Sequence, residues 1–234
     1  MNETSDFDLR ERKRFHFEMT PFRAVITAIL SGVFRLLMRM EVVGLENFPL
    51  DGPVIVAANH VTNFDVFPMQ LSLPRPIFFM GKAELFKNPV MDAVLRSLGA
   101  FPVYRGEKDR WASLHAARVL DQGQTLGMFP EGTRSRSRGL GVAKTGTARL
   151  AIEKGAPIVP MAIVGTDRFF KRFPRRARVT VSLMPPLLPL PGETPLALTD
   201  RLMFALAAGL PADMRGVYAE IPEGFHETRH AVRN

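Results

Sequence analysis

Two short polar segments of the chain contain the residue types that chemistry requires. The first is Asn59-His60-Val61-Thr62-Asn63-Phe64-Asp65, and the second is Phe129-Pro130-Glu131-Gly132-Thr133-Arg134-Ser135. Each one directly follows an apolar, strand-like run, which spans 53–58 in the first case and 125–128 in the second. Polar groups at the ends of sheet strands are typical of an active site in an α/β protein.

In the first segment, a histidine and a carboxylate lie close together in the sequence. On one continuous helix their side chains would be separated by about 140°, so they meet only if His60 lies in a turn and Asp65 begins the next helix. Thr62 or Asn63 would then cap that helix, and its amides would face a reacting carbonyl. Such a pair suits a general base, because the carboxylate fixes the tautomer of the imidazole. The alternative is that both residues only cap the helix.

We expect no metal site, because His60 and Asp65 offer two ligands and nothing nearby completes a set. The chain contains no cysteine, which excludes disulfides, thiolate metal ligands and cysteine nucleophiles.

In the second segment, Glu131 is suited to accept a hydrogen bond from a substrate hydroxyl, and Arg134 to hold a phosphate with its planar pair of donors. The alternative is a turn with an internal Glu–Arg ion pair. Further cations accumulate around this segment. Lys82 and Arg105 follow expected strands, and Lys144 opens an expected helix. If these strand ends share one edge, the cations converge on one anion.

The composition predicts one domain with a substantial core, since 46% of the 234 residues are hydrophobic. The formal net charge of +8 favours an anionic partner, such as nucleic acid, a phosphorylated metabolite or an acidic membrane surface.

Near the N-terminus, Thr20–Met40 is predicted to be a helix, because Thr20 and Pro21 form a typical helix start. Its uncharged run, 24–34, is too short to cross a bilayer, and arginines flank it. We therefore expect a monotopic helix that lies in the membrane interface; the alternative is a core-packed helix with basic edges.

A second basic segment, 168–178, combines arginine and lysine with phenylalanine. This composition is compatible with binding single-stranded nucleic acid, with an acidic lipid surface, or with a solvated loop.

Strand-like runs alternate with helix-like stretches from Val42 onward, which predicts an α/β fold. The expected strands are 54–58, 77–80, 100–104, 125–128, 158–164 and 179–183. The expected helices are 88–98, 109–122, 144–154 and 196–210, the last of which follows a proline-rich connector at 187–195.

Four sequence blocks, in this order, resemble those of glycerolipid acyltransferases of the lysophosphatidic acid acyltransferase type. His60 to Asp65 matches the family's HxxxxD motif, and the other blocks are 99–106, 129–135 and 159–165. Four ordered blocks are much more specific than any one of them alone.

The resemblance implies transfer of a fatty acyl group from acyl-CoA or acyl carrier protein to the free hydroxyl of a lysophospholipid, most simply 1-acyl-sn-glycerol-3-phosphate. His60 would be the general base and Asp65 would orient it, with no cofactor required. The residues implied to hold the acceptor are Arg105, Glu131, Gly132, Thr133 and Arg134, with Pro160 shaping the channel. Another lyso-lipid or lipid-like alcohol, or a non-catalytic membrane or nucleic-acid-binding role, are the alternatives.

The expected architecture is a single α/β domain with a mixed, mostly parallel central sheet flanked by helices, plus the membrane-associating helix. Residues 1–41 would form the arm and helix, 42–215 the acyltransferase domain and 216–234 a polar tail. We expect the protein on the cytoplasmic face of the cell membrane, in contact with anionic lipid and without nucleic acid.

Overall fold

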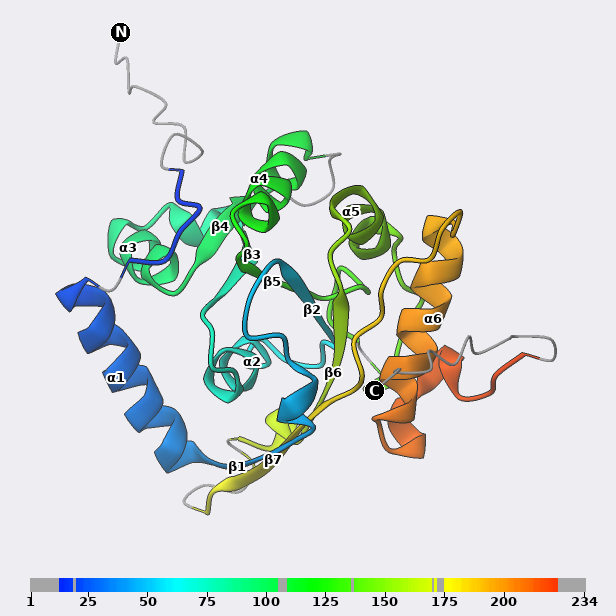
Figure 1. Ribbon diagram of the computed structural model, residues 1–234. Helices are drawn as coiled ribbons and strands as arrows, with labels where there is room; N and C mark the ends of the chain where they lie inside the picture. The colour runs from blue at the N-terminus through cyan, green and yellow to red at the C-terminus, as the bar shows by residue number, and fades with distance from the viewer. Residues whose placement is uncertain are drawn as a thin grey trace, which may run out of the picture.

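The computed structural model describes residues 13–18, 20–104, 109–135, 137–169, 171 and 175–222. Within these ranges a seven-stranded sheet has the order β1-β7-β6-β2-β5-β3-β4 (Figure 1). Its strands are β1 (Met38–Val43), β2 (Val54–Ala58), β3 (Ile77–Lys82), β4 (Ala100–Val103), β5 (Thr125–Met128), β6 (Ile158–Val164) and β7 (Ala177–Leu183).

Most neighbouring strands are parallel, as the alternation of apolar runs and helices predicts. β6, β2, β5, β3 and β4 pair in parallel, whereas β7 runs antiparallel to β6 and pairs in parallel with β1. All five residues of β2 are buried, as expected for a central strand covered on both faces. The prediction of a mixed, mostly parallel sheet in one α/β domain is confirmed.

Helices cover both faces of the sheet and create two main layers of core. They are α1 (Pro21–Leu37), α2 (Val66–Ser72), α3 (Pro89–Ser97), α4 (Arg110–Asp121), α5 (Gly146–Lys154) and α6 (Pro195–Ala208). Along β2, Ile55 and Ala57 join the core beneath α4, α5 and α6, while Val54 and Val56 join the core beneath α1 and α2. This alternation follows from the two-residue period of a strand.

The helix α1 begins where the sequence predicts but ends earlier. Thr20 caps it by accepting a hydrogen bond from the backbone N–H of Arg23 at 3.2 Å. The predicted extension to Met40 is wrong, because the chain enters the edge strand β1 at Met38. Met38–Val43 alternates buried and more exposed residues, which is the pattern of a strand. The predicted boundary between residues 41 and 42 therefore falls inside a strand of the sheet.

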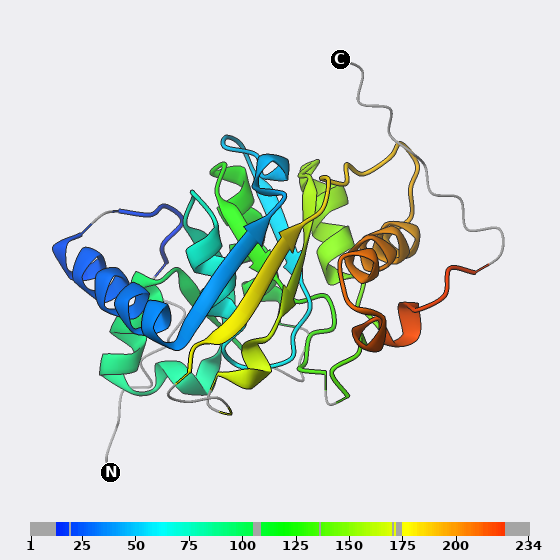
Figure 2. The same cartoon turned by 90° about the horizontal axis from the view of Figure 1, so that it is seen from below.

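Viewed from below, β1 and β7 run side by side, with α1 beyond one end of the sheet and α6 on the opposite side (Figure 2). Among the described residues, none of the helices combines the length and apolar character needed to span a membrane.

Candidate active site

The centre of the site is the turn that follows β2, where His60 and Asp65 meet. The Nδ1 atom of His60 lies 2.9 Å from Oδ2 of Asp65, and the two residues are 7% and 1% exposed. A carboxylate oxygen only accepts, so the imidazole carries a proton on Nδ1 and donates it to Asp65. Nε2 has no hydrogen-bond partner among the described residues. This is the orientation in which Nε2 can accept a proton from a substrate.

Several other donors hold the Asp65 carboxylate in place. The backbone N–H groups of Val61 and Thr62 donate to Oδ2 at 2.7 and 2.8 Å. The hydroxyls of Thr62 and Thr166 donate to Oδ1 at 3.2 and 2.5 Å. A buried carboxylate with this many donors is locked in its rotamer.

The turn between His60 and Asp65 differs from the sequence-based expectation in one respect. Asp65 occupies the N-cap position of α2, and no side chain caps the helix there. The predicted cap by Thr62 or Asn63 is therefore wrong. The Thr62 hydroxyl accepts instead from the N–H of Phe64 at 3.1 Å, inside the turn. The backbone N–H groups of this turn donate to the Asp65 carboxylate. The N-terminus of α2 therefore has no side-chain cap.

Thr166 reaches Asp65 from the end of β6, the strand next to β2, because of a tight turn after β6. Gly165 has a φ of 101°, and a Cβ atom at this position would collide with the carbonyl oxygen of Arg178. Only glycine fits such a turn without strain. Thr166 follows directly and is 3% exposed. Sequence reasoning missed Thr166, although its position just after a strand end was a usable signal.

The second polar segment supports His60 from the other side. The ring of Phe129 stacks on the imidazole with centroids 4.0 Å apart and planes inclined by 16°. The carboxylate of Glu131 accepts from the N–H of His60 at 3.2 Å and from the N–H of Gly141 at 2.8 Å. Ser135 donates its N–H to the carbonyl oxygen of His60 at 2.7 Å. The 129–141 loop is therefore held against His60 by hydrogen bonds to the backbone of His60.

Glu131 faces the backbone of its own chain and is only 7% exposed. Burial raises the pKa of its carboxyl above the ordinary value, and the two backbone donors oppose that shift. Contact between Glu131 and an acceptor hydroxyl, as the sequence suggested, stays a prediction.

A pocket of about 220 Å³ opens at His60, at the carboxyl ends of β3 and β5. Most of its lining is apolar, and Lys144 is its cationic side chain among the described residues. The Lys144 side chain lies close to Gly132, whose φ of 69° opens the turn there. The other lining residues are Phe79, Met80, Val103, Gly127, Met128, Phe129, Pro130, Gly146 and Thr147. Such a lining suits an apolar chain near one anionic group.

The remaining predicted site residues are more widely spread. Lys82 is exposed at the end of β3 and forms an ion pair with Glu84 at 3.4 Å. Thr133 and Arg134 are exposed in the 129–141 loop, and Pro160 is buried within β6. Arg105 lies outside the described residues. Direct contact of these residues with an acceptor stays a prediction.

The fold and the site define an α/β protein with a buried His–Asp pair beside an apolar pocket at the end of its central strands. Residues 39–164 match the model of the Acyltransferase family, so the chain belongs to that family.

Individual relatives confirm the resemblance to the lysophosphatidic acid acyltransferase type. The 1-acyl-sn-glycerol-3-phosphate acyltransferase of Borreliella burgdorferi is 30% identical over 159 residues, which cover 67% of this chain and 62% of that protein. The protein of the same name from Bacillus subtilis is 33% identical over 142 residues, covering 60% of this chain and 67% of that protein. The match spans 45% of a chloroplastic relative from Brassica napus, so this chain covers less than two thirds of some relatives.

A solved structure supports the fold as well. The crystal structure of the 1-acyl-sn-glycerophosphate (LPA) acyltransferase PlsC from Thermotoga maritima aligns with a TM-score of 0.67 at 27% identity. The alignment covers 80% of this chain and 77% of that one.

Proposed function

We propose that this protein is an O-acyltransferase that moves a fatty acyl group from a thioester donor to the free hydroxyl of a lysophospholipid, in the first place 1-acyl-sn-glycerol-3-phosphate. The observation that carries this proposal is the His60 imidazole, which Asp65 orients so that Nε2 remains without a partner among the described residues, at the apolar pocket. The names of the relatives supply the substrate class.

The proposed reaction needs one positioned base and no cofactor. Nε2 of His60 takes the proton of the acceptor hydroxyl while that oxygen attacks the thioester carbonyl. The tetrahedral intermediate then collapses, the C–S bond breaks, and the leaving thiolate takes the proton back from the imidazolium. Asp65 stabilises the positive charge on the ring during this step. The products are the diacyl phospholipid and the free thiol of the carrier.

The acceptor phosphate is proposed to lie between Lys144 and Arg134. Lys144 lines the pocket, and Arg134 is exposed in the loop that Glu131 ties to His60. A cation beside an apolar pocket fits a ligand with one charged end and one acyl chain. Acyl-CoA or acyl carrier protein is the proposed donor, and each of them brings anionic groups to a chain of net charge +8.

We further propose that α1 lies on the membrane as a monotopic helix. Its exposed large apolar residues recur at spacings of three and four positions, which places them on one side: Phe22, Val25, Ile29, Val33 and Leu36. The opposite side buries Arg23 and Phe34 against the rest of the protein. A helix that exposes an apolar stripe on one side and packs against its protein on the other is typical of a helix that lies in the membrane interface.

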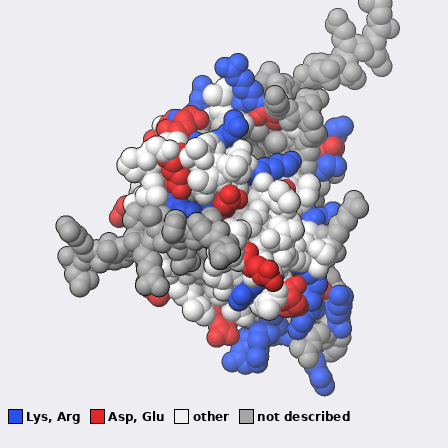
Figure 3. All heavy atoms as spheres, turned by 90° about the vertical axis from the view of Figure 1, so that its right-hand side faces the viewer, with Lys and Arg blue, Asp and Glu red and all other residues white. Residues whose placement is uncertain are grey.

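A basic cluster at the β1–β7 end supports the same orientation. Arg39, Arg168, Arg176 and Arg178 border one open depression there. Figure 3 shows Lys and Arg side chains gathered at the lower end of the molecule, the end at which β1 and β7 lie in Figure 1. Each such cation near an anionic leaflet contributes about 1 kcal/mol to binding. Location at the cytoplasmic face of the cell membrane is proposed on this basis, with lipid as the anionic partner.

An acceptor panel tests the proposed activity. The purified protein is incubated with labelled acyl-CoA, or acyl carrier protein loaded with the same chain, and with 1-acyl-sn-glycerol-3-phosphate, lysophosphatidylcholine or a long-chain alcohol. We expect the phosphate monoester to be preferred and His60→Ala to abolish product formation while the folded fraction is unchanged. Equal turnover by the wild type and His60→Ala would refute the mechanism, and preference for another acceptor would replace the proposed substrate.

A further inference from the structure

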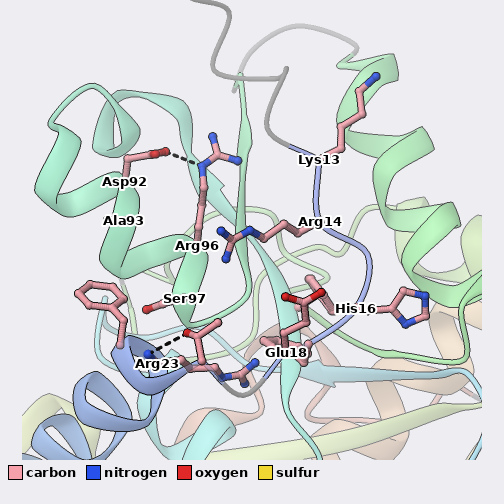
Figure 4. Close-up of a pocket in the computed structure, with 13 residues that line it drawn as sticks. Lys13, Arg14, His16, Glu18, Arg23, Asp92, Ala93, Arg96 and Ser97 are labelled. Carbon is pink, nitrogen blue, oxygen red and sulfur yellow. Dashed lines mark hydrogen bonds and ion pairs between the residues drawn. The ribbon is translucent and has the colours of Figure 1, made fainter.

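A second and larger cavity, of about 630 Å³, lies away from His60. The segment 13–18, the start of α1 and the helix α3 enclose it, as Figure 4 shows. It shares no lining residue with the pocket at His60. On β3, Phe78 lines this cavity, whereas Phe79 and Met80 line the pocket at His60. Its size falls within the range of small-molecule sites.

The lining of this cavity is cationic. Lys13, Arg14, Arg23 and Arg96 face two carboxylates, those of Glu18 and Asp92. Asp92 is already engaged, because its Oδ1 atom accepts from Nε of Arg96 at 2.6 Å. Among the lining residues that the structure describes, Lys13, Arg14 and Arg23 therefore remain against one exposed acid, Glu18.

Arg23 is the central feature, since it is only 7% exposed and borders the cavity. Its guanidinium lies 3.8 Å from the centre of the Phe17 ring, which covers one face of the planar group. Among the described residues no side-chain or backbone acceptor is paired with that guanidinium. Burial lowers the pKa of Arg23. A guanidinium stacked on one face keeps its N–H edge for a ligand in the plane.

We propose that this cavity binds a phosphate group through Arg23 and Arg14. A phosphate matches the fork of an arginine with paired oxygens, and its charge offsets the excess of cations in the lining. An unpaired buried cation is costly, so an anion that enters here stabilises the folded protein as it binds.

The phosphate has two possible sources, a phospholipid headgroup or a soluble phosphorylated compound. Phe22 lies at the cavity and is the first residue of the exposed apolar stripe of α1. A lipid whose phosphate occupies the cavity would thus have its chains beside that stripe. This inference is independent of the acyl transfer at His60, since the two cavities are separate.

Titration of the full chain with inorganic phosphate, at constant ionic strength set with chloride, tests the site. Arg23→Gln and Arg14→Gln should each weaken phosphate binding by about tenfold, the loss of one charged hydrogen bond. Arg110→Gln is the matched control, because Arg110 is exposed on α4 and the charge change is the same. Equal weakening by the control, or no preference of the wild type for phosphate over chloride, would overturn the proposal. Arg14 is exposed, so its variant remains informative if Arg23→Gln does not fold.

Chemical protection distinguishes the source without any substitution. Phenylglyoxal modifies accessible arginines, and phosphate should slow the modification of the exposed Arg14, read by peptide mass mapping. Slowing by phosphatidylglycerol vesicles, but not by phosphatidylcholine vesicles, assigns the site to an anionic lipid. Slowing by phosphate alone assigns it to a soluble ligand. Modification of Arg14 at one rate under all conditions would refute the site.

Discussion

Asp65→Asn separates the charge of the carboxylate from its geometry. In the structure, Oδ2 accepts from His60 Nδ1 and from two backbone N–H groups, whereas Oδ1 accepts from the hydroxyls of Thr62 and Thr166. An asparagine must therefore place its oxygen at the Oδ2 position, because an NH2 group there would face three donors. Its NH2 group then meets two hydroxyls, which are able to accept as well as donate. The tautomer of His60 is preserved and only the negative charge is lost.

This arrangement sets the expected magnitude. A charged hydrogen bond is worth about 1.5–3 kcal/mol, so losing the charge should lower kcat by roughly 10- to 150-fold. If the NH2 group turned toward His60, the tautomer would be wrong and the loss would approach about 10⁴-fold, as for the same change in a serine protease triad. The hydrogen bonds around Asp65 favour the smaller loss.

The assay is the initial rate of acyl transfer at saturating donor and acceptor, with the folded fraction checked by circular dichroism. Thr166→Val is the matched control, since it removes one hydroxyl from Asp65 but keeps the charge. In a His60→Ala background, Asp65→Asn should have no further effect, because residues that act as a unit are not additive. A wild-type rate for Asp65→Asn, or a further loss on top of His60→Ala, would refute the orienting role of Asp65.

Three further predictions concern other parts of the molecule. Arg134→Lys keeps the charge but loses the planar fork, so kcat/KM should fall several-fold for a phosphate-bearing acceptor and little for a long-chain alcohol; an equal fall for both would remove Arg134 from the phosphate site. Burial lowers the pKa of His115 from 6.5 to about 4. As the pH falls from 6.5 toward 4, the unfolded chain therefore takes up a proton at this histidine that the folded protein does not. Up to about 3 kcal/mol of unfolding free energy should be lost in that window. Urea titrations at several pH values should show this loss in the wild type and a smaller one in His115→Phe. Replacing Val25 and Ile29 by serine should weaken binding to anionic vesicles, measured by sedimentation, by tenfold or more, on the order of the apolar transfer energy of those side chains. Leu114→Ser, at an exposed position of α4, should not weaken it. Retained sedimentation of the α1 variant would contradict the membrane role of that helix.

Much of the fold could be predicted from the sequence because its strands are short apolar runs with clear limits. The bounds of β2, β5 and β6 agree with the prediction to the residue. β1 was missed because its alternation directly continues the apolar run of α1, and a short stretch after a helix reads equally well as more helix. The edge strand becomes evident only through its pairing with β7, more than a hundred residues away in the chain.

The sequence predicted the contacts between site residues that are close together in the chain, but not the contacts between residues that are far apart in the chain. His60 and Asp65 are near each other in sequence, and the requirement for a turn between them followed from helix geometry alone. Thr166 and Phe129 come from other strand ends, and only the strand order brings them to His60. The sequence also does not show which way a carboxylate faces, which matters most for Glu131.

Glu131→Gln decides between an acceptor-binding and a supporting role for that residue. Glutamine keeps one acceptor oxygen, so one of the two bonds to His60 N–H and Gly141 N–H is lost and an NH2 group faces a backbone donor. An unmet buried donor costs about 1–3 kcal/mol, and here it loosens the tie between the 129–141 loop and the general base. A supporting role therefore predicts a fall in kcat of similar size for acceptors with and without a phosphate, together with a lower unfolding free energy. A direct contact with the acceptor predicts instead a rise in KM confined to some acceptors, at unchanged stability. Steady-state kinetics on two acceptors, with urea unfolding of the same samples, separates these outcomes. The structure favours the first, because both oxygens of Glu131 are already engaged by the backbone.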